Sequence, residues 1–179
     1  MSGKNVIRLF SKDETCSWLF PILFEDEHYI ALDKMSHMSV SHSQLHPDRP
    51  SLSELIRNSI ENKARWVIKK NINYLGLAYR LDFETSGISL FCKSNEARVA
   101  IGDLLGSNQE YREFDCLVHG SPKDDVFNVD SKIGWVAGQP EIMKAGKRGK
   151  FASTKFEVLE RFAGMTMLRC VPDLSLIHI

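Results

Sequence analysis

The side chains best suited to chemistry in this sequence are concentrated between residues 80 and 86. They comprise a guanidinium, two carboxylates and two hydroxyls, from Arg80, Asp82, Glu84, Thr85 and Ser86. Two carboxylates this close form a candidate acid–base pair of the kind that hydrolases use. An aspartate in a turn, however, more often bonds its own backbone. The residue types alone therefore do not select a reaction.

This segment is predicted to be a turn that leads directly into a buried strand. Thr85 and Ser86 are typical turn residues, and Gly87 can adopt the positive φ that many turns require. Residues 88–92 are apolar and bounded by polar residues, as in a short buried strand. A carboxylate on such a turn is held on a rigid support where a ligand can reach it, which marks Asp82 as a candidate functional residue.

The other elements are predicted from periodicity and turn residues. A capping box of Ser51 and Glu54 opens an amphipathic helix that extends to about residue 69, and a second helix is expected over residues 94–106. Further strands are expected over residues 22–25, 29–33, 111–120, 152–159 and 165–172, and loops over residues 34–48, 71–76, 121–130 and 144–150. About seven strands, mostly in hairpins, and two helices indicate an α+β fold.

The composition is that of an ordinary soluble globular chain. Of the 179 residues, 43% are hydrophobic and 26% charged, and 23 basic residues balance 23 acidic ones. No apolar run approaches the roughly 20 residues that span a bilayer. The four cysteines contain no C-x-x-C pair that would indicate zinc or a disulfide framework. We therefore expect a cytoplasmic protein with reduced thiols and no membrane association.

Two further polar clusters carry weaker signals. Five positive charges fall within twelve residues, at Lys144, Lys147, Arg148, Lys150 and Lys155. Such a run is compatible with RNA contact, but it is more often a solvated face. His42 and His46 have a spacing that suits a metal ion on a helix, but Pro47 favours a loop and a third ligand is lacking. No metal is expected.

The segment from Arg80 to Ile88 resembles the signature of the RluA-like RNA pseudouridine synthases, the ribosomal large-subunit and tRNA type. That signature reads Arg-Leu-Asp-x-x-Thr-Ser-Gly and is followed by hydrophobic residues. The resemblance extends in order from about residue 20 to residue 173. It includes a loop that begins at Lys34, and residues 152–159 match the family's Ala-x-Thr-x-Phe-x-Val-Leu run.

The resemblance implies both a fold and an activity. The fold is the pseudouridine synthase catalytic fold, a mixed, mostly antiparallel bent sheet flanked by helices. The activity is the isomerisation of specific uridines to pseudouridine in rRNA or tRNA, with Asp82 as the nucleophile and no metal or organic cofactor. Phe114 would stack on the flipped uridine, Arg80 would fill the vacated space or pair with phosphate or carboxylate, and Arg112 would contact RNA. We expect the protein to act on structured RNA as a monomer.

Two departures from the family pattern stand out. Arg112 and Phe114 fall in the register of the family's Lys-x-Tyr-x-Ala-x-Val-x-Gly, so a phenylalanine replaces the tyrosine, which keeps a stacking face but loses a hydroxyl. The family's later Gly-Arg-x-His-Gln-Ile-Arg, whose basic residue pairs with the aspartate, is not reached. The final residues 174–179 match the translation of a transposon-end sequencing adapter. We therefore expect an N-terminal extension (1–20), an incomplete, C-terminally truncated catalytic domain (21–173) and an adapter artefact (174–179).

Two alternatives remain open at this point. The first is a non-catalytic RNA-binding relative or an inactive fragment, which the phenylalanine at position 114 and the missing basic motif would favour. The second is a hydrolase that uses Asp82 and Glu84 as a carboxylate pair. Release of tritium from C5-labelled uridine separates the first from a synthase, and cleavage of simple glycosides would support the second.

Overall fold

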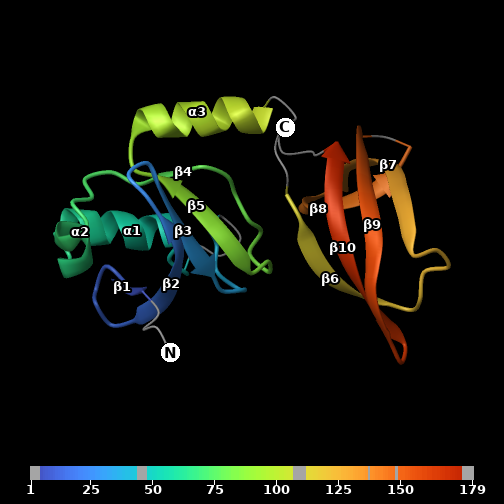
Figure 1. Ribbon diagram of the computed structural model, residues 1–179, viewed down its shortest axis with the longest axis horizontal. Helices are drawn as coiled ribbons and strands as arrows, with labels where there is room; N and C mark the ends of the chain where they lie inside the picture. The colour runs from blue at the N-terminus through green and yellow to red at the C-terminus, as the bar shows by residue number, and fades with distance from the viewer. Residues whose placement is uncertain (1–4, 44–47, 107–111, 137, 148, 175–179) are drawn as a thin grey trace. The chain divides into compact units, whose positions relative to one another are not determined.

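The computed structural model describes residues 5–43, 48–106, 112–136, 138–147 and 149–174 (Figure 1). The chain divides into two compact units, Met1–Leu105 and Gly106–Ile179. Each unit contains one five-stranded sheet, and every strand pairing among the described residues is antiparallel. The predicted α+β class with mostly antiparallel sheets is therefore confirmed.

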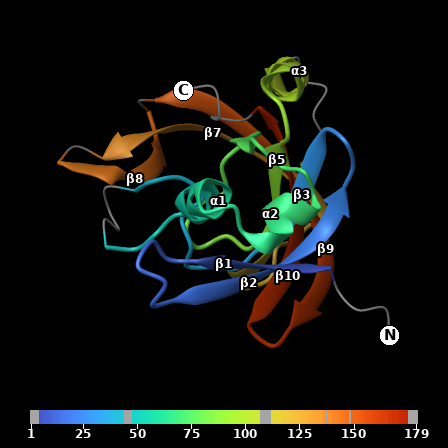
Figure 2. The same ribbon diagram turned by 90° about the vertical axis from the view of Figure 1, so that its left-hand side faces the viewer.

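The described residues of the first unit form a sheet of order β1-β2-β3-β5-β4 and three helices. The strands are β1 (Val6–Phe10), β2 (Ser17–Glu25), β3 (Tyr29–Lys34), β4 (Gly76–Leu77) and β5 (Gly87–Cys92). The helices are α1 (Leu52–Glu61), α2 (Arg65–Lys69) and α3 (Asn95–Gly106). Figures 1 and 2 show α1 and α2 next to the edge strand β1. The core is formed by fully buried side chains of the sheet and α1, among them Leu9, Phe20, Ile30, Leu32, Leu52, Leu55, Ile56 and Phe91.

The first helix begins where the sequence predicts. The Ser51 hydroxyl accepts a hydrogen bond from the Glu54 N–H at 3.3 Å, and the Glu54 carboxylate accepts one from the Ser51 N–H at 2.7 Å. These reciprocal bonds satisfy two amides that the first helical turn leaves without partners. The predicted capping box is thus confirmed.

The predicted single helix to residue 69 is wrong, because α1 ends at Glu61 and α2 follows after a break. Lys63 adopts φ of +50°, its N–H donates to the Ile60 carbonyl, and the Ala64 N–H donates to the Ser59 carbonyl. This pair of bonds is a Schellman motif, which ordinarily places glycine at the left-handed position. Without a glycine at residue 63, the apolar repeat continues across the break and conceals it.

The second unit is a sheet of order β6-β10-β9-β7-β8. Its strands are β6 (Phe114–His119), β7 (Val126–Val136), β8 (Gln139–Gly146), β9 (Lys150–Phe162) and β10 (Met165–Leu174). The predicted hairpin of the last two strands is confirmed, since Phe162 pairs with Met165 across the turn. The loops predicted for residues 121–130 and 144–150 are wrong in part, because β7 begins at Val126 and β8 extends to Gly146. The pairing of β7 with β9, and of β8 with β7, outweighs the turn-forming and charged composition of these two segments.

Part of the segment expected as an N-terminal extension belongs to the sheet of the first unit. Residues 6–10 form β1, and β2 begins at Ser17. The residues expected to be an adapter artefact lie outside the described residues from position 175 onward. Among the helices that the structure describes, none is long and apolar enough to cross a membrane.

Candidate active site

The segment that carries Asp82 forms the predicted turn before β5. The Thr85 N–H donates to the Asp82 carbonyl at 3.2 Å, which closes the turn. Gly87 has φ of +123°, a value that an L side chain rarely adopts. Leu81 is buried, whereas the carboxylates of Asp82 and Glu84 are exposed. The turn thus presents both acidic groups to solvent from a fixed support.

The turn is held from the other side by the segment after β3. The Met38 N–H donates to the Phe83 carbonyl at 3.2 Å. The His37 ring lies edge-on to the Phe83 ring at 5.5 Å, and the Arg49 guanidinium lies 5.5 Å from the centre of the same ring. A cation over a ring face and an edge-to-face pair are both favourable geometries. Phe83, which the sequence leaves without a role, therefore anchors the turn.

A buried lysine lies beside the two carboxylates. The Lys34 side chain is 0% exposed, and its Nζ donates to the Met35 carbonyl at 3.0 Å and to the Met38 carbonyl at 2.9 Å. Burial lowers the pKa of Lys34, and the negative charges of Asp82 and Glu84 oppose that shift. The lysine therefore ties the segment after β3 to the acidic turn by both hydrogen bonds and charge.

Sequence reasoning did not identify Lys34 as a site residue, because it treated the lysine as the start of a loop. In the structure Lys34 is the last residue of β3 and pairs directly with Gly87 of β5. The sequence feature that could have identified Lys34 is a cation at the end of an apolar strand. That strand pairs with the one that follows the signature.

Arg80 lies in the same unit and is exposed on the segment that leads into the turn. It makes no hydrogen bond or ion pair with another described residue. The two residues just before it are bonded to β5, because the Ala78 N–H donates to the Leu90 carbonyl at 3.0 Å and the Tyr79 hydroxyl donates to the Ile88 carbonyl at 2.8 Å. The guanidinium of Arg80 is thus available to an anionic ligand near Asp82.

The two remaining predicted site residues, Arg112 and Phe114, belong to the second unit. Phe114 is the first residue of β6, half-buried, and pairs with Cys170 of β10. Beyond Cys170 in the same cross-strand row lie Phe156 of β9 and Phe127 of β7, whose stacked rings have centres 5.2 Å apart. Arg112 is half-buried and has an interaction partner. Phe114 is therefore part of a cross-strand row that also contains Cys170, Phe156 and Phe127.

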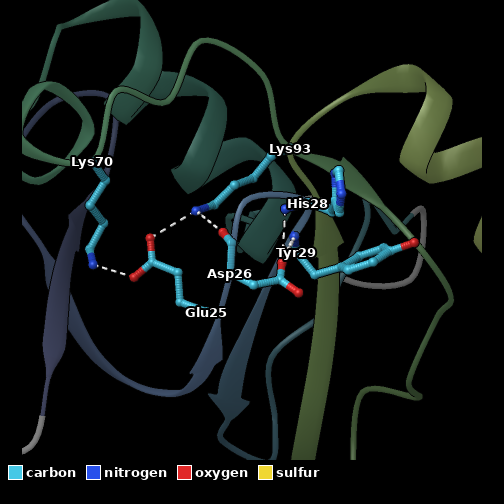
Figure 3. Close-up of polar contacts among 6 residues, drawn as sticks. All are labelled: Glu25, Asp26, His28, Tyr29, Lys70 and Lys93. Carbon is cyan, nitrogen blue, oxygen red and sulfur yellow. Dashed lines mark hydrogen bonds and ion pairs between the residues drawn. The ribbon is translucent and has the colours of Figure 1, made fainter.

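A second charged cluster in the first unit has its charges mutually satisfied (Figure 3). The Glu25 carboxylate accepts hydrogen bonds from Lys70 and, at 2.9 Å, from Lys93. Burial by itself raises the pKa of Glu25, but the bonds and charges of the two lysines outweigh it and hold the pKa below 4.5. Asp26 beside it accepts the N–H groups of His28 and Tyr29, at 2.8 and 2.6 Å. This cluster fastens the β2–β3 turn and is structural.

No group of three or more His, Cys, Asp or Glu side chains among the described residues is arranged to hold a metal ion. Of the two histidines with metal-like spacing, His42 lies 3.3 Å from the Glu54 carboxylate, and His46 lies outside the described residues. The chemistry that this arrangement supports is that of an exposed carboxylate held rigidly beside a buried cation.

Comparison with known proteins points to one family. The RNA pseudouridylate synthase family matches residues 28–174. The chain is 31% identical over 158 residues to ribosomal large subunit pseudouridine synthase D of Nitrosomonas europaea, covering 88% of this chain and 43% of that protein. It is 28% identical over 159 residues to ribosomal large subunit pseudouridine synthase C of Escherichia coli K12, covering 88% of this chain and 46% of that protein. The chain thus spans about half the length of these curated relatives.

Solved structures show the same fold. Human RNA Pseudouridylate Synthase Domain Containing 4 matches with a TM-score of 0.67 and 18% identity, over 88% of this chain and 60% of that one. Human RNA Pseudouridylate Synthase Domain Containing 1 matches with a TM-score of 0.67 and 14% identity, over 89% and 61%. At these identities the likeness concerns fold.

Proposed function

The chain belongs to the RNA pseudouridylate synthase family, and from that premise we propose that it carries the uridine-isomerising site of an RNA pseudouridine synthase, with Asp82 as nucleophile. The observation that carries the proposal is the exposed carboxylate of Asp82 on a turn fixed by Phe83, Lys34 and Gly87. Pre-positioning of a nucleophile lowers the barrier by removing motions that the reaction would otherwise have to freeze.

The reaction is balanced without any cofactor. The bond between N1 of uracil and C1′ of the ribose breaks, the base turns, and a bond between C5 and C1′ forms. C5 loses its hydrogen as a proton, and N1 takes up a proton. An ionised carboxylate can carry the covalent intermediate, by attack at either the sugar or the base. The side chains needed from the protein are therefore a nucleophile, a stacking surface and cations for RNA.

We propose that each unit carries residues that contact RNA. Arg80, beside the turn, is suited to a phosphate or to the space that a flipped uridine leaves. Phe114 is the candidate platform for the flipped base, and Arg112 lies two residues before it. On β7–β9, exposed lysines supply further positive charge, at Lys132, Lys144, Lys150 and Lys155. The names of the relatives favour ribosomal RNA as substrate, with tRNA as the second choice.

The direct test is tritium release from C5-labelled uridine in ribosomal RNA and in tRNA, measured beside RNA binding. A synthase releases tritium from one of these RNAs with a defined stoichiometry. A non-catalytic relative, which phenylalanine in place of the family's tyrosine would favour, binds RNA and releases none. Binding without release on both RNAs would replace our proposal by that alternative.

A further inference from the structure

A pocket in the first unit lies away from the signature turn, between β1 and α2. It encloses about 350 Å³ and is lined by residues of those two elements, among them Val6, Arg8, Phe10, Arg65, Trp66 and Lys69. We call it the β1–α2 pocket. Figures 1 and 2 both show the strand and the helix side by side. Neither the signature nor the resemblance assigns a role to these residues.

The alternation of buried and exposed side chains along β1 determines which of its residues face outward. Ile7 and Leu9 are buried in the core, so Val6, Arg8 and Phe10 point to the opposite side. On that side Val6 is 41% exposed and Phe10 42% exposed. An edge strand therefore presents an aromatic ring and a guanidinium on one outward face.

The helix adds two more cations on its own face. Arg65 and Lys69 are four residues apart, so their side chains lie one turn above the other. Arg8 of β1 lines the same pocket, and among the residues that the structure describes no acidic side chain does. None of the three cations has a hydrogen bond or an ion pair with another residue that the structure describes. Three like charges around one pocket repel one another, and an anionic ligand would relieve that repulsion.

The combination of rings and cations defines the chemistry of the ligand. A phosphate satisfies guanidinium and ammonium groups, and a nucleobase has a flat face that stacks on an exposed aromatic ring. A volume of about 350 Å³ is at the lower end of small-ligand pockets, which is the scale of a single nucleotide. A base paired in a duplex keeps its faces covered, so the nucleotide must be unpaired.

We propose that the β1–α2 pocket binds one unpaired nucleotide of the substrate RNA, with its base against Phe10 and its phosphates on Arg8, Arg65 and Lys69. This rests on the proposed function for the identity of the RNA, but not for the binding itself. The pocket would act as a second anchor that holds a single-stranded segment apart from the target uridine.

The test measures affinity for a fluorescent single-stranded RNA over a range of salt concentrations. Arg65→Gln combined with Lys69→Gln removes two phosphate contacts, so the slope of log K against log salt falls by about 1.4. Phe10→Ala removes the stacking face and weakens binding about tenfold or more. Arg57→Gln is the matched control, an exposed arginine on α1 outside the pocket, and it leaves affinity within twofold. Circular dichroism establishes that every variant is folded.

The outcomes test the pocket proposal and the proposed isomerase function independently. The pocket proposal is overturned if the pocket variants keep the affinity and salt slope of the wild type. It is also overturned if a duplex RNA of the same length competes equally well. Both results hold whether or not tritium is released. Weakened single-strand binding in the pocket variants, in a protein that releases no tritium, would support the pocket and reject the isomerase.

Discussion

Lys34 and Gly87 are paired across β3 and β5, and this pairing sets a buried ammonium beside the turn that displays Asp82. The glycine permits the positive φ with which the turn ends, and the lysine bonds the two carbonyls of the segment that contacts Phe83. The two residues thus hold the Asp82 turn in different ways. Gly87 acts through its backbone conformation, and Lys34 acts through its charge.

The buried state of Lys34 predicts a pH-dependent contribution to stability. Burial lowers the pKa of Lys34 in the folded protein below 10.5, so the unfolded chain binds more protons in the range between the two values. The free energy of unfolding of the wild type should therefore rise relative to Lys34→Met as the pH increases toward 10.5. Urea unfolding of both proteins from pH 7 to pH 10 measures the difference. A difference that stays constant or falls contradicts the burial of a charged lysine, and Lys12→Met, at an exposed lysine, serves as control.

Glu25 is expected to stabilise the first unit only while it is ionised. Its pKa lies below 4.5 in the folded state, so its contribution is complete above that pH and is lost as the pH falls through the folded value. At pH 7, Glu25→Gln should lower the free energy of unfolding by about 1–3 kcal/mol, because two lysines lose their partner. The deficit should shrink when unfolding is measured at pH 3.

The neighbouring Glu27→Gln provides the comparison for this prediction. Glu27 is 84% exposed, and its ion pair among the described residues is with His28. Its replacement should leave stability within about 0.5 kcal/mol. Equal effects of the two substitutions at pH 7 would show that the Lys70–Glu25–Lys93 cluster does not stabilise the fold.

Lys63 should be a position where glycine improves the protein. Its φ of +50° is strained for a side chain with a Cβ, and glycine adopts it freely. Lys63→Gly should raise the free energy of unfolding by about 0.5–1 kcal/mol, as measured by thermal or urea unfolding. Lys63→Ala keeps the strain and should not raise it. A stabilising alanine would mean that removal of charge, and not backbone conformation, is responsible.

The cysteines should differ sharply in reactivity. Cys170 is buried with its Sγ 3.3 Å from the Sγ of Cys116, and burial together with that neighbour raises the pKa of Cys170 to about 12. The thiol is therefore protonated at pH 8 and inert to alkylation, whereas the exposed Cys16 should be modified first. Mass spectrometry of iodoacetamide-treated folded protein measures the order. Early modification of Cys170 would contradict its buried, protonated state.

Local chemistry explains why part of this structure can be predicted from the sequence. The Ser51–Glu54 box, the Gly87 turn and the β9–β10 hairpin each depend on a few neighbouring residues with strong preferences. The break at Lys63 and the strand β8 could not be predicted in this way. The first uses a residue with no left-handed preference, and the second is stabilised by pairing with the preceding strand β7, which overrides local composition.

The same distinction between local preferences and strand pairing applies to the candidate site. The types and spacing around Asp82 indicate a functional turn, and Arg80 is exposed beside it as required. The burial of Lys34 and the anchoring of Phe83 depend on β3 being paired with β5, which no short motif encodes. The roles of Arg112 and Phe114 toward RNA stay predictions.

The measurement that tests the central claim most directly compares Asp82→Asn with Glu84→Gln in the tritium-release assay. The two substitutions remove the same charge from two exposed carboxylates of one turn, both near Lys34. If Asp82 is the nucleophile, Asp82→Asn lowers tritium release by about 10⁴-fold or more while RNA binding is kept, and Glu84→Gln retains most of the activity. Release that survives Asp82→Asn would contradict the account, and equal loss in both variants would point instead to a carboxylate pair.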